Sequence, residues 1–438
     1  MNPADHVNPV KVAAGVDAVT PDLLAFAQEL VRIPSLPGDE RAAHEAAGKA
    51  MRRLGLNVSV VSPTRPDVAD HPAFCDDGLP IEGRVSLVGR WRAGTPRSGA
   101  RSLILNGHLD VVSPGDPSRW TESPWSGRID GGRLYGRGAC DMKAGVACAI
   151  FAIAALQRIG FEPGADVLVE TVSGEESGGL GTLATIVAGH RADAAVILEP
   201  TSLRVCPVQA GALTFRLVVR GRAAHGALKH SGVSAVEKLC LLLDALDRLD
   251  RERHARRSHP LFSNPRQIAP VSVGVVRAGD WPSTVPDAAI AEGRFGVFPG
   301  ESVDEARRAL ESAVRAAADG DPWLRAEPPA VEWFEGQFEA GETPADAPIV
   351  QALSEAHRSV HGVAPVVEGV PYGSDLRLFT NHAGIPCVLY GPGDVARAHT
   401  VGEWVAVDEV IAATRAIAAL VAGWTGSPEV ISRSTSVP

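Results

Sequence analysis

The segment 143–159 constrains the fold most, because its helical pattern is apolar on every side. It consists almost wholly of Ala, Val, Ile and Leu. A helix that is apolar all round is buried all round, so other elements must cover each of its faces. Strand patterns lie around it at 85–91, 102–112, 167–173 and 194–198. Strands that alternate with helices predict an α/β fold, in which a largely parallel, mixed sheet carries helices on both faces.

The pattern changes after residue 211. An alternating strand at 213–219 is followed by a long helix at 234–256, two more strands and another helix. This order predicts a small α+β, ferredoxin-like sandwich. The strand pattern at 329–336 is expected to return to the first sheet. The segments expected from this pattern are 1–211 and 326–438 for the first domain, with 212–325 inserted between them.

Charge and composition limit the classes of partner. The net charge of −10 argues against nucleic acid and anionic membranes as main partners. No run of about 18 apolar residues occurs, so we expect no membrane span. Residues 1–19 lack a basic region followed by an apolar stretch, which indicates a soft tail and not a signal peptide. Six scattered cysteines without a CxxC pair favour reduced thiols in the cytoplasm.

The sequence NGHLDVV, at 106–112, places a histidine and an aspartate in an apolar strand pattern. Residues i and i+2 of a strand share a face, so His108 and Asp110 are expected side by side. Taken alone, a hydrogen-bonded pair in the core explains them as well as a functional pair does.

Other ionisable residues also follow apolar strand patterns. Each has an ordinary explanation: Asp141 as a helix N-cap, the glutamates as loop or surface charges, and His399 as a loop histidine. In an open α/β sheet, however, ligands bind at the carboxyl ends of strands. Two histidines with several carboxylates are a recognised ligand set for zinc, manganese or cobalt. The residues placed at this edge are His108, Asp110, Asp141, Glu175, Glu176, Glu199 and His399.

These residues lie in motifs that resemble those of the M20 metallopeptidases, and within them the acetylornithine deacetylase and succinyl-diaminopimelate desuccinylase group. The resemblance spans about 85–410. The motifs occur in family order as NGHLDVV, GRGACDMKAG, SGEESGG, ILEPT, GRAAH, GSDLR and YGPGDVARAHTVGEWV. It implies a catalytic domain of the phosphorylase/hydrolase-like, zinc-peptidase type, with an inserted lid and dimerisation domain.

The resemblance also implies a metal centre of two divalent ions per subunit, with Zn²⁺ expected first and Co²⁺ or Mn²⁺ as alternatives. His108, Asp141 and Glu199 would hold one ion. Asp141, Glu176 and His399 would hold the other, so that Asp141 bridges the pair.

Three further residues take catalytic roles by resemblance. Glu175 would be the general base, and Asp110 would orient His108. His225 would reach the active site of a neighbouring subunit and stabilise the oxyanion, with a surface loop histidine as the alternative reading. The inserted domain would form a homodimer.

Substrate binding is expected at Arg377, Gly391 and Thr284. Arg377 matches an arginine that often binds a substrate carboxylate, although an ion pair with Asp375 or another acid is an alternative. The segment 282–286 departs from the family pattern, in which Asn often stands, so the acyl group cannot be carried over from the relatives.

The expected function is a dinuclear-metal amidohydrolase that removes an acyl group from an N-acyl amino acid or a similar small amide. An exopeptidase, either a carboxypeptidase or a dipeptidase, is an alternative on the same scaffold. A non-catalytic binding protein is a rival of another class, which loss of a ligand or of the base would indicate; all are present.

Overall fold

The computed structural model describes residues 8–426, which form two compact units. The first comprises the described residues up to Pro207, then Glu342–Glu368 and the described residues from Leu378 onward. The second comprises Val208–Gly341 and Gly369–Arg377. The second unit therefore extends beyond the expected end at residue 325.

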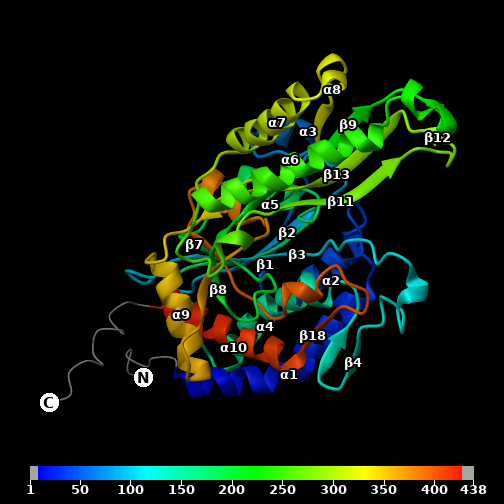
Figure 1. The fold of residues 1–438 in the computed structure, drawn as a ribbon. Coiled ribbons are helices and arrows are strands. Elements are labelled where there is room, and N and C mark those ends of the chain that lie inside the picture. Colours follow the sequence, from blue (N-terminus) through cyan, green and yellow to red (C-terminus); the bar gives the residue numbers. More distant parts are fainter. Residues whose placement is uncertain (1–7, 427–438) are drawn as a thin grey trace. The chain divides into compact units, whose positions relative to one another are not determined.

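A nine-stranded mixed sheet forms the core of the first unit (Figure 1). Its four central strands are parallel, as the sequence predicted, and antiparallel strands flank them. In spatial order the strands are β1 (Asn57–Val61), β2 (Ser86–Trp91), β6 (Val167–Val172), β3 (Leu103–His108), β7 (Ala194–Ile197), β17 (Cys387–Leu389), β8 (Val205–Gln209) and β15 (Gly341–Glu342), with β16 (Val367–Val370) beside β8.

Helices cover both faces of this sheet, as two neighbouring residues of β3 show. A side chain at Gly107 would meet Val146 and Met142, whereas the Asn106 amide donates a hydrogen bond to Thr182. Successive strand residues point to opposite faces, so the helices that carry Val146 and Thr182 lie on opposite sides. The helices of this unit are α1 (Pro9–Arg32), α2 (Arg41–Arg53), α3 (Arg65–Val68), α4 (Ala144–Arg158), α5 (Leu180–Val187), α9 (Pro348–His361) and α10 (Val407–Trp424).

Helix α4 corresponds to the segment 143–159, whose helical pattern is apolar on every side. The stretch Ala139–Arg158 is long and apolar enough to cross a membrane, but 83% of its most apolar window is buried inside the protein. Helices α1 and α10 pack against α4. Burial from every side is thus provided by the protein's own elements.

Helix α1 corrects the expectation of a soft N-terminal tail from Pro9 onward, whereas the part of that expectation on residues 1–7 lies outside the described residues. The helix begins at Pro9, where the Asn8 side chain accepts a hydrogen bond from the backbone of Val10 at 2.9 Å. Asn at the N-cap and Pro at the first helical position are a favoured start. Val12 and Val16 are buried at helical spacing, so packing against the unit continues the helix.

The second unit is an α+β sandwich whose sheet order is β11-β13-β9-β14, with all neighbouring pairs antiparallel. Strand β14, expected to return to the first sheet, pairs with β9 here. An antiparallel neighbour on β9 satisfies the backbone groups of that edge, which is why this unit ends later than residue 325. Its elements are β9 (Gly211–Arg220), β10 (Ala224–His225), α6 (Ala235–Arg256), β11 (Val271–Ala278), β12 (Thr284–Val285), β13 (Ala288–Val297), α7 (Val303–Asp319), α8 (Pro322–Ala326) and β14 (Ala330–Phe338).

Candidate metal centre and active site

The ionisable cluster lies where parallel strands of the first unit end. His108 is the last residue of β3, and Glu175 with Glu176 follows β6. Glu199 follows β7. Strands β6, β3 and β7 are parallel neighbours, so their carboxyl ends share one edge of the sheet. Asp141 lies in the turn before α4. The edge expected from the sequence is therefore the edge at which these residues gather.

Ligand atoms approach one another closely within the cluster. His108 Nε2 lies 3.0 Å from Asp141 Oδ1 and 3.8 Å from Glu199 Oε1. His399 Nε2 lies 3.3 Å from Asp141 Oδ2 and 3.1 Å from Glu176. Asp141 thus stands between the two histidines, with one carboxylate oxygen turned toward each.

These separations fit two metal ions. Nitrogen and oxygen ligands of zinc lie about 2.0–2.2 Å from the ion, so two ligands at a tetrahedral angle are about 3.4 Å apart. The distances from His108 and His399 to their carboxylate neighbours fall close to that value. Asp141 has the place of a carboxylate shared by both ions. The residues present would hold the pair of ions in the arrangement that the resemblance implied.

The charge balance of the cluster also favours cations. Hydrogen bonds to Asp141 and Glu176 raise the pKa of His399 to about 10. Burial by itself lowers the pKa of His108, but the neighbouring carboxylates, with Asp141 first, carry it well above the usual range. Burial and the charge of Asp141 raise the pKa of Glu176. Metal ligation requires neutral histidines, so bound divalent ions would replace the imidazole protons.

Asp110 takes a different place from the expected one. Its backbone carbonyl, and not its carboxylate, accepts the hydrogen bond from His108 Nδ1, at 2.8 Å. The carboxylate Oδ1 lies farther from that nitrogen, at 3.7 Å. Instead, the carboxylate accepts hydrogen bonds from the backbone N–H groups of Glu175 at 3.2 Å and Glu176 at 3.0 Å. Because β3 ends at His108, the chain has already turned at Asp110.

The turn that follows β6 separates the two glutamates. Gly174 has a φ of +72°, and a Cβ there would lie 2.2 Å from Arg84 Nη2. Glycine at this position permits the bend between β6 and the two glutamates. Glu175 is 7% exposed, and a carboxylate oxygen of it lies within 4.8 Å of His108 and Glu199 ligand atoms. Glu176 lies 3.1 Å from His399 Nε2 and within 4.8 Å of ligand atoms of His108 and Asp141, so the two glutamates share His108 as a neighbour and differ in their other partners.

Glu403 is a buried acid to which the sequence reading gave no role. Its Oε1 accepts hydrogen bonds from the backbone N–H groups of Cys140 at 2.9 Å and Asp141 at 3.2 Å. Its Oε2 accepts one from Arg137 Nη1 at 2.5 Å. Burial and the Asp141 carboxylate raise the pKa of Glu403 to about 7. The only signal in the sequence is an acid four residues after His399.

Gly391 also belongs to the first unit. Its N–H donates to Thr201 Oγ1 at 3.1 Å, and a Cβ there would lie 2.4 Å from the Leu198 carbonyl oxygen. Glycine is required at this place because the two segments approach so closely. The close approach fixes the chain beside Glu199, while contact of Gly391 with a substrate stays a prediction.

The other expected site residues belong to the second unit. His225 and Thr284 are paired in the short β10–β12 ladder, and His225 Nδ1 accepts a hydrogen bond from Ala227 at 3.1 Å. Arg377 is 1% exposed, with its guanidinium 5.1 Å from the Phe338 ring and 4.0 Å from Glu339. Glu339 is therefore an acid near Arg377, which agrees with the alternative of an ion pair with Asp375 or another acid.

Comparison with known proteins identifies the family. The family model described as "Peptidase family M20/M25/M40" matches residues 104–423. The chain belongs to this peptidase family, so the resemblance read from the ordered motifs is confirmed. Like its homologues it is a metal-dependent hydrolase that acts on amide bonds.

Relatives within the family differ in substrate. The chain is 29% identical to N-formyl-4-amino-5-aminomethyl-2-methylpyrimidine deformylase of Bacillus subtilis, over 78% of this chain and 83% of the relative. It is 32% identical to acetylornithine deacetylase of Myxococcus xanthus, over 82% and 88%. Its fold matches the M20 family metallo-carboxypeptidase of Sulfolobus solfataricus with a TM-score of 0.73 at 17% identity, covering 92% of this chain and 99% of that one.

Proposed function

We propose that the chain is a dinuclear-metal amidohydrolase that removes a small acyl group from the nitrogen of an amine or an amino acid. The observation that carries this proposal is the position of Asp141 between His108 and His399, at 3.0 and 3.3 Å, with Glu175 in the same cluster. Such a centre suits hydrolysis of an amide, whose carbonyl is too weak an electrophile for water alone.

The ligands assigned by resemblance have the geometry to hold two ions. When bound, the ions lower the pKa of water to about 7 and polarise the amide carbonyl. Glu175 accepts the proton of the attacking water and passes it to the leaving amine. Asp110 holds the backbone of Glu175, so that the carboxylate is presented from a fixed turn. Zn²⁺ is the ion proposed first, with Co²⁺ or Mn²⁺ as substitutes.

The acyl group is proposed to be short, and formyl and acetyl are the groups to test first, because the segment 282–286 departs from the family pattern and does not itself indicate the acyl group. The names of the two relatives above describe removal of a formyl group from an aminomethylpyrimidine and of an acetyl group from ornithine. These substrates share a short acyl group and differ in the amine. Arg377, Gly391 and Thr284 are proposed to recognise the amine part.

Metal removal followed by a substrate panel tests this function. Protein dialysed against a chelator should lose amide hydrolysis, and Zn²⁺, Co²⁺ or Mn²⁺ should restore it. The panel pairs N-formyl, N-acetyl and N-succinyl amines and amino acids with dipeptides, and mass spectrometry follows the released amines. Full activity of protein shown by elemental analysis to be metal-free would refute the assignment.

An exopeptidase is the second candidate, because the fold matches a metallo-carboxypeptidase over nearly all of both chains. The same metal centre would serve either reaction, so the two candidates differ in the pocket alone. In the panel, dipeptide hydrolysis at least tenfold faster in kcat/KM than hydrolysis of every N-acyl compound would favour the exopeptidase.

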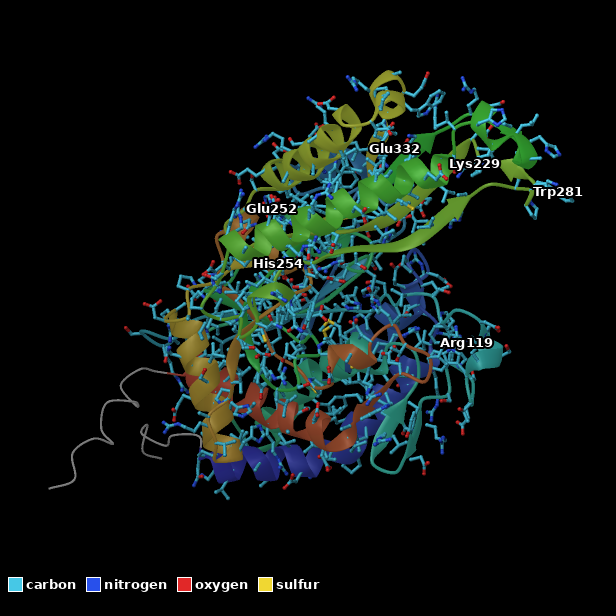
Figure 2. All side chains as sticks on the ribbon, in the orientation of Figure 1. Arg119, Lys229, Glu252, His254, Trp281 and Glu332 are labelled. Carbon is cyan, nitrogen blue, oxygen red and sulfur yellow. The ribbon has the colours of Figure 1, made fainter. Side chains whose placement is uncertain are left out.

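A homodimer through the second unit is also proposed, with edge strand β11 as the paired surface. The α6 leucines Leu239, Leu242 and Leu246 are buried inside their own unit, so they are not available to a partner. Edge strand β11 instead exposes Val276, and the adjoining Trp281 is 69% exposed and points outward (Figure 2). An exposed apolar edge strand favours pairing with a second copy.

The oligomeric state of edge variants tests the dimer. Val276→Lys should yield monomers by light scattering, because a charge on an edge strand opposes pairing. Val363→Lys, at an exposed valine of the first unit, is the matched control and should stay dimeric.

The six cysteines form no disulfide, which supports the further proposal of a cytoplasmic protein.

A further inference from the structure

Glu403 joins two distant parts of the chain beneath the metal centre. Its carboxylate accepts hydrogen bonds from the backbone N–H groups of Cys140 and Asp141. Its backbone carbonyl accepts a hydrogen bond from the N–H of Gly136 at 3.0 Å. The next residue, Trp404, pairs with Tyr135 in the β18–β5 ladder of strands Trp404–Ala406 and Arg133–Tyr135. The segment from Tyr135 to Asp141 is therefore held at both ends by Glu403 and Trp404, which lie at the beginning of β18.

Both ends of this connection carry metal ligands. Asp141 is the carboxylate that stands between the two histidines, and its backbone N–H is held by Glu403 Oε1 at 3.2 Å. His399 lies four residues before Glu403 in the same segment, and its ring reaches Asp141. One side chain thus sets where the Asp141 backbone lies relative to the segment that supplies His399.

Glu403 and its partner Arg137 are charged side chains that are both buried from solvent. Glu403 is 0% exposed. Arg137 donates to Glu403 Oε2 and lies 5.5 Å from the Trp120 ring. A buried guanidinium needs a counter-charge, so the pair holds the carboxylate in one orientation, with its other oxygen turned to the two N–H groups.

We infer that Glu403 is a positioning residue that, through the backbone of Asp141, fixes Asp141 and His399 at the separation two metal ions require. It touches neither substrate nor reacting atoms. Groups outside the ligand set commonly contribute 10- to 100-fold in metal affinity. The inference rests on the proposed dinuclear centre, and it adds a determinant of metal affinity to it.

Glu403→Gln tests the inference with little change of shape. In either orientation the amide places an N–H against a donor, because Arg137 lies on one side and the backbone N–H groups lie on the other. Titration against a chromophoric chelator should show metal affinity lowered by at least tenfold, most of all for the ion bound by His399. The melting temperature of metal-free protein is measured in parallel.

The second unit offers a matched control. Arg253 and Glu301 form another buried pair, at 2.6 Å, and Glu301 also accepts the backbone N–H of Phe298. Glu301→Gln should lower the melting temperature of metal-free protein as Glu403→Gln does, while metal affinity stays within twofold of wild type. Equal loss of affinity in both variants would show that Glu403 acts on stability alone, and would overturn the inference.

A double variant keeps the test decisive if Glu403→Gln fails to fold. Arg137→Met with Glu403→Met replaces the pair by apolar side chains, which proteins often tolerate, yet it removes the acceptor of the Asp141 N–H. Arg253→Met with Glu301→Met is its control. Wild-type metal affinity in the Arg137/Glu403 double variant would overturn the inference. Failure of wild-type protein itself to bind two ions would instead refute the proposed function.

Discussion

The Asp110 carboxylate accepts a hydrogen bond from the backbone N–H of Glu175, at 3.2 Å. The same carboxylate accepts a hydrogen bond from the next N–H along the chain, so it holds the turn that carries both the proposed base and a proposed ligand. We expect Asp110→Asn to lower kcat by about 10- to 100-fold, because its amide places a donor against these N–H groups. Steady-state kinetics with metal analysis measures this.

Asp193→Asn is the control for that variant. The Asp193 carboxylate also accepts a backbone N–H, from Ser102 at 2.7 Å, but on an exposed part of the surface. Its kcat should stay within twofold of wild type. An Asp110→Asn protein with full kcat would mean that the turn keeps its geometry without the carboxylate.

Substitutions of the two adjacent glutamates should have different effects on kcat and on metal content. Glu175→Gln should keep both ions and lose about 10²–10⁴ in kcat, because the proton acceptor is removed. Glu176→Gln should lower the metal content, because Glu176 faces His399 at 3.1 Å. Elemental analysis beside kinetics separates them. Metal lost at 175 and retained at 176 would reverse the two roles.

His225 is expected to act across a subunit boundary. His225→Ala should cost about 10²–10³ in kcat, the usual effect of losing one oxyanion donor, while metal content stays normal. Mixing inactive Glu175→Gln with inactive His225→Ala subunits should restore activity, because each heterodimer then holds one site with both residues. Well-mixed heterodimers that stay inactive would place the action of His225 within its own chain.

Arg377 is tested with matched substrates. Arg377→Met should reduce kcat/KM at least tenfold for N-acyl amino acids and less than threefold for N-acyl amines without a carboxylate, because only the former offer a bidentate partner. An equal loss for both substrates, together with a lower melting temperature, would assign Arg377 to the structural pair with Glu339.

His44 should make the protein sensitive to acid. Its Nε2 lies 2.8 Å from Ser173 Oγ, and this hydroxyl donates to the Val85 carbonyl, so Nε2 is the donor in this hydrogen bond. Burial lowers the pKa of His44 from 6.5 to about 3. The unfolded chain therefore binds a proton first, and the stabilisation present above pH 6.5 is lost as the pH falls toward 3.

Urea unfolding of metal-free protein measures this effect. Between pH 7.5 and pH 5.5 wild type should lose about 1.4 kcal/mol more unfolding free energy than His44→Gln, which has no such group to protonate. Equal losses in the two proteins would show that His44 titrates with its ordinary pKa in the folded state.

The parts predictable from sequence were those with a local pattern. The apolar helix that ends at Arg158 and the strands around it have hydrophobic patterns that can be read from the sequence alone. The α/β class could therefore be predicted without knowing which elements are neighbours. The proposed ligands could be picked out because they end or follow such strands: His108 is the last residue of β3, and Glu199 follows β7. Glu175 and Glu176 could be told apart only through the resemblance, since neighbours in sequence carry no sign of which way a turn presents them.

The parts missed depend on partners far along the chain. Nothing near Asp110 indicates that its carboxylate meets N–H groups 65 and 66 residues away. Glu403 meets Asp141 across 262 residues. Strand β14 has the pattern of any half-buried strand, which does not reveal that β9 is its neighbour. Such pairings are decided by the whole fold, and one sequence read by periodicity does not contain them.

The proposed ligands come from segments on both sides of the second unit in the sequence, so the order of synthesis limits when the metal centre can form. His108 emerges early from a ribosome, but His399 follows only after the whole of the second unit has been synthesised. A nascent chain can therefore present four of the five proposed ligands before the second unit is made, but not the fifth. We expect the second ion to be bound only after His399 has been synthesised, and a proteolytic cut just before His399 would remove one proposed ligand.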